Sequence, residues 1–112
     1  MTSVLENSSN ENLLYKIKSW DDEKLDLKQK LLRGIYAFGF ENPSSIQSKA
    51  LYPMTFRPAR DIIAQAQSGT GKTGAFVTGT LQIINEKVFH TQAVILAPTH
   101  ELAIQTKQVL DD

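Results

Sequence analysis

The sequence contains no cysteine. That absence excludes a disulfide framework and any metal site that depends on thiolates. Its two histidines, His90 and His100, are too few and too isolated for a zinc site. No apolar run approaches the roughly 20 residues that cross a bilayer, and the N-terminal residues do not have the pattern of a secretory signal. We therefore expect a soluble protein of the cytoplasm, with the nucleus as the alternative compartment.

An excess of charge of either sign is also missing, because 12 lysines and arginines balance 12 aspartates and glutamates. A neutral chain has no broad basic footprint, so any binding of nucleic acid must depend on local geometry. The 112 residues suit one domain. The shares of hydrophobic residues, 41%, and of charged residues, 21%, are ordinary for a globular protein.

The first 60 residues fall into two regions. Residues 1–18 are rich in Asn, Ser and Glu, and we expect a mobile N-terminal extension there. Residues 19–60 have helical patterning, with apolar residues on one face of a helix that Gly39 should end. The apolar residues of that face are Leu27, Leu31, Ile35 and Phe38.

A second, shorter helix is expected to begin at Pro43 and Ser44. It would carry Ile46, Gln47 and Ala50. After it, Pro53 and Pro58 are expected to bracket a loop.

Residues 61–112 alternate between short apolar runs and helical patterns. This order predicts an α/β domain with one βαβ unit, whose two strands are parallel and joined by a right-handed crossover. The expected elements are a strand over 61–66, a glycine-rich turn over 68–71, a helix from Lys72 to about Glu86, a strand over 93–97 and a helix over 101–110.

The glycine-rich turn has the residue types of a phosphate-binding loop. The loop comprises this turn and its flanking residues, between a predicted strand and a predicted helix: Ala66, Gln67, Ser68, Gly69, Thr70, Gly71, Lys72 and Thr73. Glycines allow several backbone N–H groups to point inward at anionic oxygens, and the start of the helix adds its positive end. Lys72 would reach the β- and γ-phosphates of ATP, and the Thr73 hydroxyl would ligate Mg²⁺. The general pattern begins with Gly, whereas Ala66 stands there in this chain.

Two more segments have ambiguous signals. Gln47 at the start of a helix could read the N6 and N7 edge of adenine, with Trp20 covering the base, but the residues alone favour a solvent-facing Gln on an amphipathic helix. Pro98 and Thr99 precede a helix whose N-terminus could bind phosphate, but Thr99 could simply be the N-cap.

Together the three segments resemble the motifs of the DEAD-box RNA helicase family. Gly39, Phe40, Pro43, Ile46 and Gln47 are similar to its Q motif. Residues 66–73 are similar to its motif I, in which Ala at the first position is normal, and residues 98–103 are similar to its motif Ia. Residues 31–37 and 63–67 look most like the translation-initiation branch of that family.

The resemblance implies a partial RecA-like, P-loop NTPase domain with parallel strands, flanking helices and an incomplete sheet. It implies an ATP-dependent RNA helicase that uses ATP and Mg²⁺, with Gln47 at the adenine and residues 67–73 at the phosphates. It also implies that RNA lies along its sugar-phosphate backbone at Pro98, Thr99, His100 and Glu101. Translation-initiation scaffold proteins are the implied partners.

Two residues depart from the family pattern. Trp20 stands where the family usually has Phe, and the segment from there to Gly39 is slightly longer than in the family. His100 replaces the usual Arg of motif Ia, which removes a fixed charge and a bidentate donor.

The catalytic carboxylates that ATP hydrolysis needs are absent from the sequence. The family supplies them as an Asp-Glu-Ala-Asp motif, and the acidic residues at 111–112 instead continue a helical pattern. We therefore expect the isolated chain to be inactive as an ATPase and to represent a gene fragment, a truncated transcript or a degenerate copy. The alternatives are a non-enzymatic nucleotide- or partner-binding fragment or relic, and a different phosphate-loop enzyme such as a nucleotide kinase.

Overall fold

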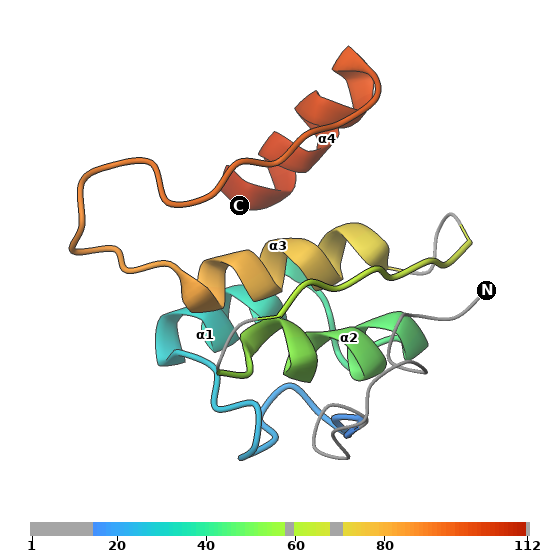
Figure 1. The fold of residues 1–112 in the computed structure, drawn as a ribbon. Coiled ribbons are helices and arrows are strands. Elements are labelled where there is room, and N and C mark those ends of the chain that lie inside the picture. The colour runs from blue at the N-terminus through green and yellow to red at the C-terminus, as the bar shows by residue number, and fades with distance from the viewer. Residues whose placement is uncertain (1–14, 58–59, 68–70, 112) are drawn as a thin grey trace.

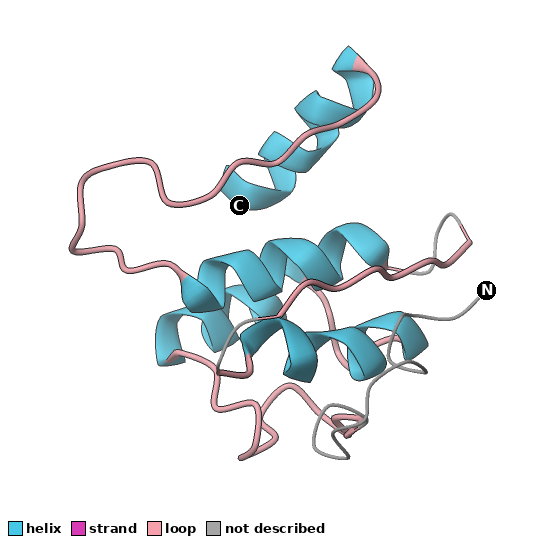
Figure 2. Cartoon of the chain, in the orientation of Figure 1, coloured by secondary structure: helices cyan, strands magenta, loops and turns pink. Residues whose placement is uncertain are grey.

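The computed structural model describes residues 15–57, 60–67 and 71–111. Within these ranges the chain forms helices and irregular segments and no strand (Figures 1 and 2). The helices are α1 (Gln29–Phe38), α2 (Ser45–Thr55), α3 (Lys72–Ile83) and α4 (His100–Asp111). None of these helices is long and apolar enough to span a membrane.

Helix α1 ends where the sequence predicts. Gly39 has a φ of 105°, in the left-handed region, and its N–H donates to the carbonyl oxygen of Tyr36. A residue without a Cβ adopts this conformation at little cost, which is why glycine terminates many helices. Ile35 on the predicted apolar face is buried, whereas Phe38 keeps 43% of its surface exposed.

Helix α2 begins with a capping box. The Ser44 side chain accepts a hydrogen bond from the Gln47 N–H, and the Gln47 side chain accepts one from the Ser44 N–H. The expectation that Pro53 opens a loop is wrong, because α2 continues through it to Thr55. A proline here costs the helix one backbone hydrogen bond and crowds the carbonyl four residues earlier. Pro53 is itself buried, so packing offsets that cost, and the helix ends two residues later. Pro58 lies outside the described residues.

Helix α3 packs most extensively on α2, and glycine permits the contact. A Cβ built at Gly79 would lie 2.5 Å from the Met54 Cε. The interior glycine that weakens the sequence-based prediction of this helix is therefore a helix-packing residue. The helix ends at Ile83, slightly before the predicted Glu86.

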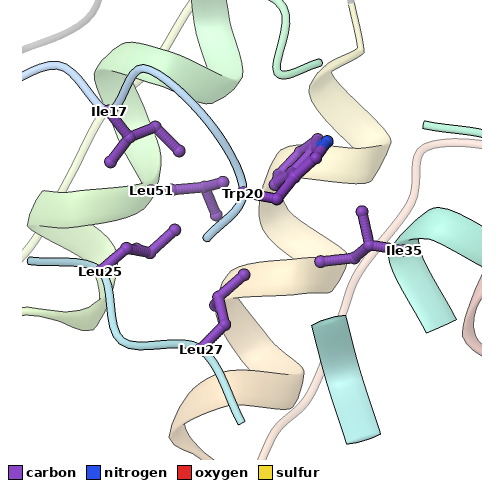
Figure 3. Close-up of a cluster of buried hydrophobic side chains, with 6 residues drawn as sticks. All are labelled: Ile17, Trp20, Leu25, Leu27, Ile35 and Leu51. Atoms are coloured by element: carbon purple, nitrogen blue, oxygen red, sulfur yellow. The ribbon is translucent and has the colours of Figure 1, made fainter. Parts of the chain in front are cut away.

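The buried core joins α1 and α2 to the non-helical residues before α1. It consists of Ile17, Trp20, Leu25, Leu27, Ile35 and Leu51 (Figure 3). The Ile17 N–H also donates to the Ser48 carbonyl oxygen at 3.0 Å. The packed part of the chain thus begins before residue 19, because Ile17 is a buried apolar residue in a segment predicted to be mobile.

Neither segment predicted as a strand is paired within the described residues. Residues 60–67 run past α2 and α3, and residues 84–99 lead from the end of α3 to α4, which returns to contact α3 (Figure 1). Their apolar side chains remain in contact with water: Ile63, Val94 and Leu96 are 74%, 75% and 90% exposed. A strand needs a neighbour for its N–H and C=O groups, and neither segment has one here.

Candidate nucleotide-binding site

The start of α3 has the geometry of an anion-binding helix end. Gly71 has a φ of 92° and precedes Lys72, the first residue of the helix. The first N–H groups of a helix have no partner within it, and they lie at its positive end. Lys72 is exposed and Thr73 is half-buried. Ser68, Gly69 and Thr70 lie outside the described residues, so the loop is described only at Ala66 and Gln67 and from Gly71 onward.

Gln47 connects the start of α2 to the end of this loop. Its Nε2 donates to the Gly71 carbonyl oxygen at 3.1 Å, and its Oε1 accepts from the Ser44 N–H at 2.8 Å. The side chain is 3% exposed. A carboxamide has two N–H groups and two acceptor lone pairs, so one of each remains after these bonds. That remainder is the donor and acceptor pair that an adenine edge requires.

Close contact with Gln47 explains the glycine at 71. A Cβ built on Gly71 would lie 2.6 Å from the Gln47 Nε2 and 2.9 Å from the Ser44 Oγ. Its left-handed φ already disfavours any other residue. The sequence contained a signal for part of this arrangement, since Ser44 and Gln47 have the spacing of a capping box.

Trp20 lies in the core behind the site. Its side chain is fully buried, and it stacks on Phe40 with ring centroids 6.2 Å apart. Phe40 in turn approaches the first turn of α3, where a Cβ on Gly74 would lie 3.3 Å from its ring. The structure thus brings Trp20 toward the start of α3 through Phe40, but it leaves no face of the indole open to a base. Among the residues that the structure describes, the indole Nε1 finds no hydrogen-bond partner.

The four residues predicted to contact RNA lie together at the start of α4. Pro98, Thr99, His100 and Glu101 are all exposed. The Thr99 Oγ1 accepts a hydrogen bond from the Leu102 N–H at 3.2 Å, so Thr99 has the geometry of an N-cap.

A cavity of about 490 Å³ connects the two groups of residues. Lys72 and Thr73 line it from the start of α3, and Pro98 lines it from the start of α4. Ile62 and Leu96, from the two predicted strands, also line it. In the described ranges there is no cluster of three His, Cys, Asp or Glu side chains that could hold a metal ion. Thr73 is the residue at which the loop pattern places Mg²⁺.

Comparison with known proteins identifies the family. The sequence profile of the DEAD/DEAH box helicases matches residues 44–112. The chain belongs to the DEAD/DEAH box helicase family. This result confirms the resemblance derived from the three motifs.

Individual relatives agree with the assignment. The chain is 52% identical over 100 residues to the ATP-dependent RNA helicase eIF4A of Candida albicans, covering 89% of this chain and 23% of the relative. It is 54% identical over 88 residues to the ATP-dependent RNA helicase fal1 of Schizosaccharomyces pombe, covering 79% of this chain and 22% of the relative. The similarity to eIF4A confirms the expected likeness to the translation-initiation branch.

A solved structure shows the fold relationship. S. cerevisiae Dbp5 bound to RNA and ADP BeF3 superposes with a TM-score of 0.78 at 46% identity, over 85% of this chain and 24% of that one. The fold is therefore part of a RecA-like domain. The chain spans about a quarter of the length of these relatives.

Proposed function

We propose that this chain is the ATP- and RNA-binding front part of an eIF4A-like, ATP-dependent RNA helicase. The observation that carries the proposal is the hydrogen bond between Gln47 and the Gly71 carbonyl oxygen at the start of α3. It joins the residue that resembles the adenine reader to the loop that resembles the phosphate binder. The relatives named ATP-dependent RNA helicases support the same assignment.

The proposed nucleotide site uses the whole loop. The N–H groups of residues 67–73 surround the phosphates, and Lys72 neutralises the β- and γ-phosphates. The Thr73 hydroxyl ligates the Mg²⁺ that accompanies the nucleotide. Gln47 uses its remaining N–H and lone pair for adenine, after a small shift that opens its buried side chain. Trp20 supports the site from the core, and it can stack on a base only if the Trp20–Phe40 contact opens.

The proposed RNA site is the exposed start of α4. Pro98, Thr99, His100 and Glu101 would lie along the sugar-phosphate backbone, with the α4 N-terminus directed at a phosphate. Dbp5, whose structure contains both RNA and ADP BeF3, supports the presence of both ligands on this fold. The shared cavity supports communication between the sites, because Lys72 and Pro98 line the same space.

We also propose that residues 61–66 and 93–97 are parallel strands of one RecA-like sheet. Ile62 and Ala64 line the cavity from the first segment, and Ile95, Leu96 and Ala97 line it from the second. The two segments therefore direct apolar side chains into the same space. Intervening strands in that space would give both segments their missing hydrogen-bond partners and would bury those side chains.

Binding and hydrolysis separate in this proposal. Hydrolysis needs a carboxylate that holds Mg²⁺ and orients water, and the described residues contain no cluster of three acidic, His or Cys side chains that could hold a metal ion. We therefore expect the 112-residue chain to bind nucleotide and to release negligible phosphate, with or without RNA. We propose helicase activity only for a longer protein of the kind to which the relatives belong.

Titration with a fluorescent ADP analogue in the presence of Mg²⁺ tests the proposal. We expect saturable binding that unlabelled ADP displaces better than GDP, because Gln47 matches adenine. Lys72→Met should abolish binding, whereas Lys87→Met, at another exposed lysine, should leave it unchanged. Absence of binding, or equal binding by the Lys72→Met variant, would refute the proposal. Phosphate release that depends on Lys72 would refute the expectation of inactivity.

A further inference from the structure

The segment before α1 is hydrogen-bonded to the C-terminal end of α3. The Lys28 N–H donates to the Gln82 Oε1 at 2.9 Å, and the Gln82 Nε2 donates to the Asp26 carbonyl oxygen at 3.1 Å. Asp26 has a φ of 50°, which is unusual for a residue with a side chain. This bend lies in the irregular segment that leads into α1.

The Lys28 ammonium group caps the carboxyl end of α3. Its Nζ donates to the carbonyl oxygens of Leu81 at 3.0 Å and Ile84 at 2.6 Å, and it pairs with the Glu86 Oε2 at 3.1 Å. The last carbonyl groups of a helix have no partner within it and form its negative end. A cation at this position therefore satisfies two of them and stabilises the helix from a segment more than 50 residues away in sequence.

Apolar packing alone does not hold this half of α3 against α1. A cavity of about 400 Å³ lies beside both helices, lined by Leu31 and Ile35 of α1, by Val77 and Leu81 of α3, and by Val109 and Leu110 of α4. Lys28 is at the edge of the same cavity. Because side chains on the two helices leave this space unfilled, the polar contacts of Lys28 and Gln82 add to the limited packing between the start of α1 and the end of α3.

We propose that Lys28 is a positioning residue for the nucleotide site at the opposite end of α3. The inference depends on the nucleotide binding proposed above. Gln47 holds the first residues of the helix through Gly71, and α2 packs against it at Gly79. Lys28 holds the last residues, beyond that packing, and so restrains the remaining end of the helix. Releasing the Lys28 contact allows α3 to tilt into the cavity beside α1. Lys72 and Thr73 would then move relative to Gln47.

A purely stabilising role predicts a different result from a positioning role. If Lys28 only stabilises the fold, its loss lowers the unfolding temperature, but each molecule that remains folded binds nucleotide normally. If Lys28 positions α3, folded molecules bind nucleotide more weakly. Trp20 is the only tryptophan, and it is fully buried, so its emission, measured before nucleotide is added, reports the folded fraction.

The test compares four variants of the 112-residue chain in titrations with the fluorescent ADP analogue and Mg²⁺. Lys28→Met removes the ammonium group, Lys28→Arg retains a cation and donors, and Glu86→Gln removes only the exposed ion pair. Lys30→Met is the matched control, because Lys30 is an exposed lysine two positions away in the sequence. Affinities are measured well below the unfolding temperature of each variant and corrected for its folded fraction.

We expect Lys28→Met to weaken binding by about fivefold or more, within the range of coupling between linked sites. Lys28→Arg should restore most of the affinity, and Glu86→Gln and Lys30→Met should bind as the unaltered chain does. Equal affinity of the Lys28→Met variant and the unaltered chain, with only a lower unfolding temperature, would overturn this inference alone. Absence of binding by the unaltered chain would instead overturn the proposed function and this inference with it.

Discussion

The side chain of Gln47 donates a hydrogen bond to the carbonyl oxygen of Gly71 at 3.1 Å across 24 residues of sequence. This bond joins the first turn of α2 to the residue that precedes α3. It also gives Gln47 a structural role that is separate from any contact with a base. Substitutions at either end can therefore distinguish the architecture of the site from its recognition of nucleotide.

Replacing Gln47 with Ala should affect both stability and binding. The change removes half of the capping box and the bond to Gly71, and each such buried hydrogen bond contributes about 1 kcal/mol. We expect the free energy of unfolding to fall by about 1–3 kcal/mol. We also expect nucleotide affinity to fall and the preference for ADP over GDP to disappear. Denaturation followed by Trp20 emission measures the first effect, and competitive titration measures the second.

Gln105→Ala is the control for this substitution. Gln105 is exposed on α4, far from the capping box, so its removal should change stability by less than about 0.5 kcal/mol. A Gln47→Ala variant as stable as the Gln105→Ala variant would show that the Gly71 contact does not form in solution.

Two glycine substitutions should have opposite effects. Gly71→Ala places a Cβ against Gln47 and requires a left-handed residue, so it should destabilise the protein by about 1–2 kcal/mol. Gly34→Ala lies within α1, where a Cβ would meet nothing within 4 Å. Because alanine favours helix more than glycine does, Gly34→Ala should stabilise by up to about 1 kcal/mol. Thermal unfolding of both variants checks the pair, and destabilisation by Gly34→Ala would contradict the open environment described for α1.

Asp22 should contribute to acid sensitivity. Burial raises the pKa of the Asp22 carboxyl. Hydrogen bonds from the Tyr15 hydroxyl and from the N–H groups of Lys24 and Lys18 together lower it by more, so the net pKa lies below the ordinary value. A lowered folded-state pKa means that the stabilisation is complete above the unfolded-state value of about 3.9 and is lost as pH falls through the folded-state value.

The corresponding measurement is an acid titration of the folded state. Trp20 emission should show unfolding as the pH is lowered below about 4. Asp22→Asn should be less stable than the unaltered chain at neutral pH and should show a smaller further loss on acidification. If both proteins lost the same amount of stability as the pH fell, Asp22 would not contribute to the acid sensitivity.

His100→Arg should strengthen the binding of single-stranded RNA. Arginine restores the fixed charge at the exposed start of α4, and one added phosphate contact on a single strand steepens the salt dependence, log K against log salt, by about 0.7. Filter binding of an unstructured oligonucleotide at several salt concentrations measures both quantities. His90→Arg is the control, since it adds the same charge in the loop before residue 93, and an equal gain there would indicate a general charge effect.

Local signals in the sequence were enough to place the helices. Gly39 ends α1, Ser44 caps α2, and Thr99 caps α4, because each of these residues acts on the backbone within one turn of itself. The prediction that Pro53 opens a loop was wrong because packing, which buries Pro53 itself, extends α2 to Thr55. Local sequence does not specify that packing.

Features that depend on distant residues could not be predicted in the same way. The runs at 61–66 and 93–97 have the composition of strands, but pairing depends on neighbours that local sequence does not specify. Trp20 has the chemistry to cover a base, and only the packed structure shows that Phe40 and the core enclose it. The contacts of Lys28 with the end of α3 likewise leave no periodic signal in the sequence.

Helix α4 contributes no buried residue, whereas α3 buries five. Because α4 buries no side chain, substitutions on it need not disturb the helices beside the proposed nucleotide loop. Replacement of the usual arginine by His100 is one such change. Substitutions at the proposed RNA contact can therefore accumulate without changing the packing of α2 and α3, so the two surfaces can diverge at different rates within a single short chain.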